Sequence, residues 1–344
     1  MIVVTRNQPP QQTVELVNPQ GHVLNQTATD VSSGPFPVGV GPAGVFLYQP
    51  ESGELDLLGP TGTAQELGIT ASEQIFDPGT SAATSPNGRC WILSVISWNS
   101  AATEATTQLY VGGPVGTVNL AATLTRAGQV GGEAAGGFRV VEWAASGVLL
   151  GSDPTGVGGA GPFIDDDYQL ARVVRFDPVS GDVSSPLCPV GPGDRFADLA
   201  ADGSVACVSG EAADAQITVT SPDGSTNTYD TNAPYAGQVA FAASPLSLIF
   251  CTSQGAPEGG GGWTDSLSVL SLAQGGQAAR VMRGQDQAAW DESGSAPAKV
   301  VSTSAIADLG PSAPGSSQAA LVLISLSTGQ ATTVAPADGI LGVL

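Results

Sequence analysis

The chain has few of the residues on which catalytic and metal sites usually depend. Its 344 residues contain one histidine, His22, and ten basic side chains, of which only Lys299 is a lysine. A catalytic histidine needs a nucleophile and an orienting partner beside it, and no Gly-x-Ser-x-Gly motif supplies a nucleophile. The sequence therefore excludes Ser-His-Asp hydrolysis and any metal site built from several imidazoles. We expect His22, which directly follows a turn glycine, to be an ordinary surface residue.

Basic charge and long apolar runs are also scarce. The 31 acidic and ten basic residues give a formal net charge of −21, and such a surface repels nucleic-acid phosphates. No run of about 18 apolar residues is present, so we expect no transmembrane segment. The N-terminal residues do not resemble a signal peptide. The lysine-poor composition, rich in Ser, Thr and Gly, slightly favours an extracytoplasmic location but leaves the compartment open.

Cysteine is limited to Cys90, Cys188, Cys207 and Cys251. Three of them, all except Cys188, lie in apolar strands at similar places in different repeats. Equivalent positions on neighbouring packed sheets are about 10 Å apart, whereas the Cα atoms of a disulfide lie within about 7 Å. We therefore expect buried free thiols rather than disulfides. No C-x-x-C spacing is present, which argues against structural zinc.

What the chain does contain is a recurring turn that ends in glycine and leads into a short apolar strand. The turn occurs seven times, at intervals between 41 residues (Gly21 to Gly62) and 65 residues (Gly116 to Gly181). The mean, counted round through the termini, is about 49 residues, close to the length of one propeller blade. The closing glycines are Gly21, Gly62, Gly116, Gly181, Gly224, Gly276 and Gly329.

Each turn joins two strands of alternating polarity, and a second strand pair precedes most of them. The pairs Thr13–Val17 with His22–Thr27 and Ala197–Ala200 with Ser204–Ser209 are examples. This pattern predicts an all-β fold: one domain, residues 1–344, forming a seven-bladed β-propeller of four-stranded antiparallel blades. The N-terminal strands, residues 1–27, are one strand short of a blade. We expect the C-terminal strand, residues 340–344, to complete that blade and close the propeller.

One turn also carries a family resemblance. Ser85-Pro86-Asn87-Gly88, followed by an apolar strand and then by Gln108–Val111, resembles the WD40-like PD40 repeat of the TolB type. Partial copies at residues 201–209 and 244–250 extend the resemblance to about three of the seven blades. It implies a propeller fold. The motif is a structural turn, so the resemblance implies no partner or site for this chain.

The residues that we select as a candidate binding site lie in the longer connections. Exposed aromatic faces beside carboxylates suit a protein, peptide or glycan partner, although each aromatic side chain could instead anchor its own connection. Asp165 and Asp167 are also weak candidates for a Ca²⁺ site, the alternative being a solvated acidic loop. The candidate partner-binding residues are Trp98, Phe163, Asp165, Asp166, Asp167, Tyr168, Trp263 and Trp290.

The function that this pattern favours is a non-catalytic recognition or scaffold propeller, whose long loops on one rim bind a protein, peptide or glycan. Two alternatives stay open: a structural component of a larger assembly, and a carboxylate-dependent glycan hydrolase or lyase. We assign no catalytic residue and no cofactor besides the Ca²⁺ candidate. Asn25-Gln26-Thr27 matches a glycosylation sequon that occurs often by chance. The carboxylates at first-strand entries, which the enzyme reading would use, are Asp77, Asp194, Asp198 and Asp291.

Overall fold

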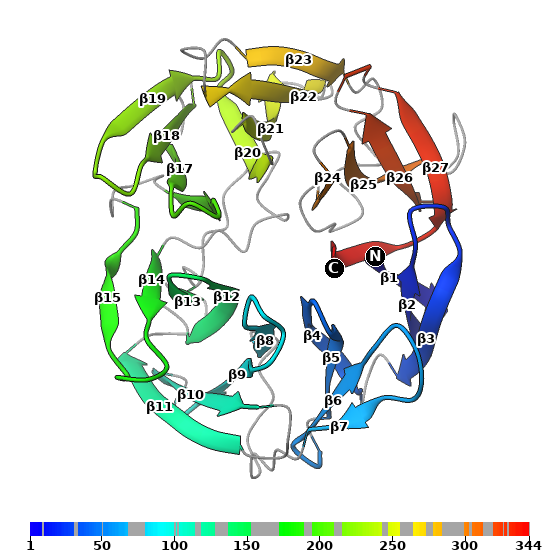
Figure 1. Ribbon diagram of the computed structural model, residues 1–344, viewed down its shortest axis with the longest axis vertical. Helices are drawn as coiled ribbons and strands as arrows, with labels where there is room; N and C mark the ends of the chain where they lie inside the picture. Colours follow the sequence, from blue (N-terminus) through cyan, green and yellow to red (C-terminus); the bar gives the residue numbers. More distant parts are fainter. Residues whose placement is uncertain are drawn as a thin grey trace. The chain divides into compact units, whose positions relative to one another are not determined.

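The computed structural model is an all-β chain, shown in Figure 1. Among the described residues there is no α-helix, and hence no helix with the length and apolarity needed to cross a membrane. Two compact units are present, one formed by residues 1–157, 172–187 and 341–344 and the other by residues 158–171 and 188–340. The structure describes residues 1–8, 10–30, 34–49, 51–67, 80–99, 101, 103–113, 118–127, 137–152, 172–188, 195–209, 215–242, 247–254, 264–272, 278–283, 299–302, 305–311, 319–325, 327–328 and 330–343.

Four antiparallel sheets, each of four strands, belong to the first unit. Their hydrogen-bonded orders are β28-β1-β2-β3, β4-β5-β6-β7, β8-β9-β10-β11 and β12-β13-β14-β15. The strands are β1 (Ile2–Gln8), β2 (Gln11–Val17), β3 (Val23–Asp30), β4 (Phe36–Gly41), β5 (Gly44–Gln49), β6 (Glu54–Leu58), β7 (Gln65–Glu66), β8 (Ser81–Thr84), β9 (Trp91–Trp98), β10 (Glu104–Gly112), β11 (Val118–Ala127), β12 (Phe138–Ala144), β13 (Gly147–Ser152), β14 (Arg172–Phe176), β15 (Val183–Pro186) and β28 (Gly339–Val343), of which the residues from Leu341 onward lie in this unit.

The second unit contributes three further four-stranded sheets, in the orders β16-β17-β18-β19, β20-β21-β22-β23 and β24-β25-β26-β27. The prediction of an all-β fold built from four-stranded antiparallel sheets is therefore confirmed. The strands are β16 (Arg195–Leu199), β17 (Val205–Ser209), β18 (Gln216–Thr220), β19 (Thr226–Asp230), β20 (Tyr235–Ala242), β21 (Ser247–Gln254), β22 (Thr264–Ser271), β23 (Ala278–Arg283), β24 (Lys299–Ser302), β25 (Ala305–Pro311), β26 (Ala319–Ser325) and β27 (Ala331–Pro336).

Local turn chemistry explains the third-to-fourth-strand hairpins. Gly21, Gly62, Gly181 and Gly224 all have φ between 79° and 86°, a conformation that costs glycine little and other residues more. The backbone N–H of Gly224 donates to the carbonyl of Ser221 at 2.9 Å, which closes one such turn. The predicted turns at Gly116, Gly276 and Gly329 lie outside the described residues.

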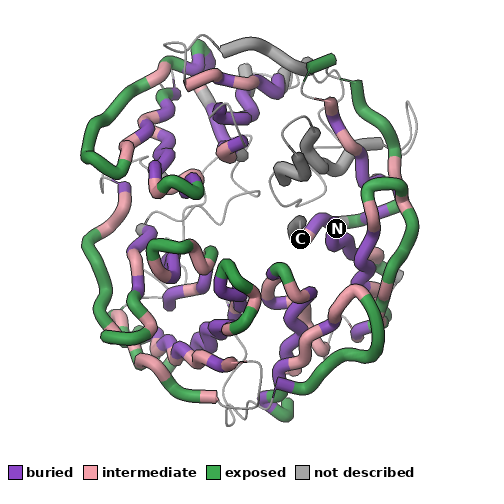
Figure 2. Tube along the Cα trace, in the orientation of Figure 1, coloured by how far each residue is buried: buried purple, intermediate pink, exposed green. Residues whose placement is uncertain are grey.

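The core lies between successive sheets within each unit. In the first unit, Val14 and Leu16 of β2 pack on Leu47 of β5, and the next two interfaces have clusters of the same kind. In the second unit, Ile217 of β18 packs with Phe250 of β21. Figure 2 shows buried middle strands in these sheets and exposed residues along the fourth strands β3, β11, β15 and β19. Apolar faces buried against the next sheet supply most of the stabilisation.

The first strands of successive sheets also approach closely. In the first unit β4 contacts β8 and β8 contacts β12, and in the second β16 contacts β20. At Gly39 in β4, an added Cβ would collide with the backbone carbonyl of Ala82 in β8. Glycine is therefore required at this position by the approach of two backbones.

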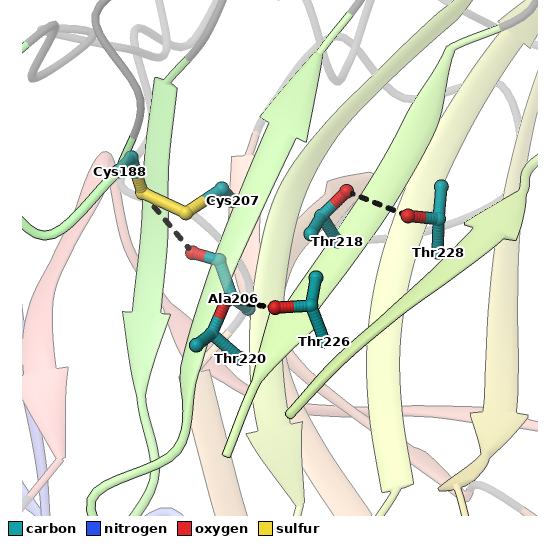
Figure 3. Close-up of a disulfide and its surroundings, with 7 residues drawn as sticks. All are labelled: Cys188, Ala206, Cys207, Thr218, Thr220, Thr226 and Thr228. Carbon is teal, nitrogen blue, oxygen red and sulfur yellow. Dashed lines mark hydrogen bonds between the residues drawn. A yellow bond between two sulfur atoms is a disulfide. The ribbon is translucent and has the colours of Figure 1, made fainter. Parts of the chain in front are cut away.

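The cysteine prediction is wrong in part, because Cys188 and Cys207 form a disulfide, drawn in Figure 3. Cys188 lies two residues after the end of the short β15, and its Cα lies 5.9 Å from that of Cys207 in β17. The spacing of about 10 Å holds between equivalent strand positions, whereas Cys188 lies in a connection and so comes closer to Cys207. Cys90 and Cys251 are not part of a disulfide, and Cys251 is buried.

Candidate functional site

The connections of each sheet leave from its two ends. Because neighbouring strands are antiparallel, the hairpins joining strands one to two and three to four leave from one end. The connection from strand two to three, and those to neighbouring sheets, leave from the other. In the β12–β15 sheet the first end has the short turns 145–146 and 177–182, whereas the second has residues 128–137 and 153–171. We call these the tight-turn end and the long-connection end of a sheet.

One other sheet shows the same separation, whereas in the sheet of β28, β1, β2 and β3 and in the β16–β19 sheet the connections at the two ends are of similar length. The β20–β23 sheet has residues 243–246 and 272–277 at its tight-turn end, and residues 255–263 and 284–298 at its long-connection end. Binding residues are disproportionately carried by long connections on a rigid scaffold. The long-connection end is therefore the candidate functional site.

Polar residues at the tight-turn end build turns. Asp177 Oδ1 accepts the backbone N–H of Val179 at 2.8 Å, and Asp223 Oδ1 accepts that of Ser225 at 2.9 Å. These backbone hydrogen bonds lower the pKa of both carboxyl groups, since they favour the ionised form. His22 is exposed at this end, as predicted, with its backbone N–H bound to Asn18 Oδ1 at 2.9 Å. The carboxylates here have a structural role in the turns.

Of the eight candidate binding residues, only Trp98 is among those described. The sequence placed it in a loop, and the structure corrects this: Trp98 ends β9, half-buried, opposite Ala105 of β10. The true connection is a tight turn, in which Asn99 Oδ1 accepts the backbone N–H of Thr103 at 2.9 Å. Trp98 thus lies on the rigid framework at the long-connection end. Phe163, Asp165, Asp166, Asp167, Tyr168, Trp263 and Trp290 lie outside the described residues.

Three acidic residues lie together on the outer strands of the β4–β7 sheet. Asp56 and Glu66 are directly opposite each other on β6 and β7, and Glu54 lies two residues before Asp56 on the same face. Burial raises the pKa of Asp56, and the charges of Glu54 and Glu66 raise it further. Among the described residues, no group of three His, Cys, Asp or Glu side chains could hold a metal ion. The Ca²⁺ candidates Asp165 and Asp167 lie outside the described residues.

Asp198 has a role that sequence reasoning missed. Its Oδ2 accepts the backbone N–H of Phe241 in β20 at 2.6 Å, and its Oδ1 accepts the N–H of Leu199 at 2.9 Å. The carboxylate therefore fastens the first strand of one sheet to the first strand of the next. A bulge in β16 lies beside Asp198, and bulges commonly change the direction in which a side chain points. The other first-strand carboxylates, Asp77, Asp194 and Asp291, lie outside the described residues.

Similar polar bonds hold β12. Its Phe138 is bound at both backbone groups: Thr107 Oγ1 accepts the N–H at 2.8 Å, and Ser94 Oγ donates to the carbonyl at 2.6 Å. Ser81 Oγ accepts the N–H of Val140 at 2.6 Å. Ser94 and Thr107 are fully buried. The strand that follows connection 128–137 is thus rigidly held by the preceding sheet.

Asn25, the asparagine of the sequon, also connects two sheets by hydrogen bonds. Asn25 Nδ2 donates to the carbonyl of Gly59 at 2.8 Å and to that of Gly62 at 3.0 Å. Both of its amide hydrogens are therefore used to hold a turn of the next sheet. This engagement is the structural role of Asn25 in the folded chain.

No protein-family model matches the sequence, and a search of curated proteins gave no significant match. Among solved structures, prolyl oligopeptidase B from Galerina marginata, bound to a 35mer hydrolysis and macrocyclization substrate, is similar with a TM-score of 0.50 at 11% identity. That match covers 95% of this chain and 46% of the other, and it concerns the fold alone.

Two TolB structures are also similar. TolB from Acinetobacter baumannii has a TM-score of 0.46 at 11% identity, covering 99% of this chain and 82% of the other. A putative TolB from Agrobacterium tumefaciens has a TM-score of 0.41 at 15% identity, covering 76% and 84%.

Proposed function

We propose that this chain is a seven-bladed β-propeller that binds a protein or peptide partner at the long-connection end of its blades. The four sheets of the first unit pack face to face in chain order, the β16–β19 sheet packs on the β20–β23 sheet, and the C-terminal strand β28 joins the sheet of β1, β2 and β3. Both features are expected of a propeller closed by its two termini.

The observation that carries the binding proposal is the separation of short and long connections between the two ends of the β12–β15 and β20–β23 sheets. A scaffold protein without a ligand has no need for chain segments such as 153–171 and 284–298 on one end only. The framework beneath them is rigid, with β12 and β20 fastened by side chains of the preceding sheets. Rigid support and long connections together suit recognition.

The screen described next also tests whether the partner is a glycan and whether the chain cleaves glycans. Of the four first-strand carboxylates, Asp198 is engaged by two backbone N–H groups, which favours a structural rather than an acid–base role. We therefore assign no catalytic residue. The acidic trio of Glu54, Asp56 and Glu66 favours a partner with basic side chains.

The test is a thermal-shift screen of the purified chain with lysine- and arginine-rich peptides, neutral peptides, oligosaccharides and Ca²⁺, because a ligand that prefers the folded state raises its melting temperature. A peptide hit is then measured by calorimetry against two variants. Trp98→Ala changes the long-connection end, whereas Val179→Ala changes a side chain that is 94% exposed at the tight-turn end.

We expect Trp98→Ala to weaken peptide binding at least tenfold and Val179→Ala to leave it unchanged. The reverse pattern would reject the site. Oligosaccharide cleavage during the screen would replace the binding proposal by a glycan-active enzyme. Stabilisation by oligosaccharides alone, without cleavage, would replace the peptide by a glycan.

A further inference from the structure

The Cys188–Cys207 disulfide encloses a short edge strand with few backbone hydrogen bonds. The two cysteines are 19 residues apart, and the segment between them contains all of β16. β16 has five residues, lies at the edge of its sheet and pairs only with β17. A bulge between Phe196 and Asp198 interrupts even this pairing. Few backbone hydrogen bonds therefore hold β16 in place.

The first strand β12, which also lies at a sheet edge and contains a bulge, is held differently. β12 receives three hydrogen bonds from Ser81, Ser94 and Thr107 of the preceding sheet. In the β16 sheet, Ala206 and Val208 face the apolar cluster shared with β20–β22. Because side chains alternate along a strand, Cys207 points to the opposite face, where Cys188 is bonded to it (Figure 3). The disulfide thus fastens the chain on the face opposite that cluster.

Both cysteines are almost fully buried, Cys188 with 5% and Cys207 with 4% of its surface exposed. A buried disulfide is protected from attack by an external thiolate, which must reach a sulfur atom in line. The strand that it encloses also carries Asp198, whose carboxylate binds Phe241 of the next sheet. Loss of the bond would therefore loosen β16 and, through Asp198, the junction between two sheets.

We propose that the Cys188–Cys207 disulfide is a redox-dependent clasp on β16, and that the chain attains its complete fold only in an oxidising compartment. In forming the bond, each thiol loses a proton and an electron to an external disulfide such as oxidised glutathione, which is released as two thiols. Persistent structural disulfides are typical of extracytoplasmic proteins. The inference goes beyond partner binding and does not depend on it.

The first experiment counts thiols and measures melting of the purified full chain. Denatured without reductant, the chain exposes two reactive thiols, from Cys90 and Cys251; after reduction it exposes all four. We expect full reduction to lower the melting temperature by several degrees. The variants Cys188→Ala, Cys207→Ala and their combination should show the same loss, without further loss on reduction. Cys90→Ala, in the other unit, is the control and should keep the reductant sensitivity.

The second experiment locates the effect by hydrogen exchange followed by mass spectrometry. Reduction should speed exchange at least tenfold in β16 and at Phe241, while the amides of β9 and β10 keep their rates. This arm uses the native sequence, so it decides the question even if an alanine variant does not fold. An unchanged melting temperature after complete reduction, or equal acceleration in β9 and β16, would overturn the proposal. Ligand binding is not a readout, so failure here leaves the proposed function standing.

Discussion

Replacing Gly39 by alanine should destabilise the first unit, whereas the same change at Gly59 should not. At Gly39 the new Cβ would overlap the backbone carbonyl of Ala82, and backbone in a neighbouring strand cannot rotate away as a side chain can. At Gly59 the nearest atom to the new Cβ is the carbonyl oxygen of Ala43, at an ordinary 3.5 Å. The two variants therefore add the same methyl group and differ only in the space that receives it.

The expected loss of stability is the balance of two opposing effects. Overpacking a close-packed region costs up to about 3 kcal/mol. Replacing a glycine in a strand by alanine stabilises the fold by about 0.7 kcal/mol, because it reduces the conformational entropy of the unfolded chain. The net loss for Gly39→Ala is therefore about 2 kcal/mol, against a change near zero or a slight gain for Gly59→Ala. Gly224→Ala has open space but a φ of 86°, and we expect an intermediate loss of about 1 kcal/mol.

Urea unfolding followed by tryptophan fluorescence measures these changes, because Trp91 is buried in the same cluster as the β4–β8 contact. With an m value near 3 kcal/mol/M, the midpoint for Gly39→Ala should fall by about 0.7 M. Equal midpoints for Gly39→Ala and Gly59→Ala would refute the close approach of β4 and β8, and with it the packing of successive sheets described above.

Three further outcomes can be measured in the same assay. Asp198→Ala should lose about 2 kcal/mol because the N–H of Phe241 is left without its acceptor, and Asp198→Asn, which keeps an acceptor oxygen, should lose less; equal losses would contradict this role. Asn25→Ala should cost about 1 kcal/mol through its two hydrogen bonds to the next turn, and an unchanged midpoint would show that they contribute nothing. Burial raises the pKa of Tyr48, as does neighbouring Tyr110, so the folded chain keeps phenolic protons that the unfolded chain loses near pH 10. Stability should therefore fall as the pH rises above about 10. In Tyr48→Phe this fall should be less steep. An equally steep fall in the variant would show that other titrating groups cause the pH dependence.

The hairpins can be predicted from the sequence because their causes are local. A glycine that reaches positive φ, next to strands of alternating polarity, specifies a tight turn between antiparallel strands, and Gly21, Gly62, Gly181 and Gly224 behave in this way. Trp98 shows the limit of that reasoning. Length alone suggested a loop, whereas Asn99 closes a shorter turn and leaves Trp98 in β9.

The candidate site was harder to foresee. Sequence can indicate which connections are long, but it cannot tell whether a carboxylate such as Asp198 points to solvent or to the backbone of the next sheet. The bond to Phe241 joins residues 43 positions apart, and nothing in the local sequence encodes that distance. The same holds for the bonds from Asn25 to a turn in another sheet.

The sequence by itself determined the all-β class, the hairpins and their turn glycines, because each depends on backbone conformation within a few residues. Only the tertiary structure decided which side chains fasten one sheet to the next and that Cys188 meets Cys207. Those contacts depend on how close two separate strands come, and packing sets that distance. The requirement for glycine at position 39 is of the second kind, since its φ is ordinary and the carbonyl of Ala82 alone excludes a side chain.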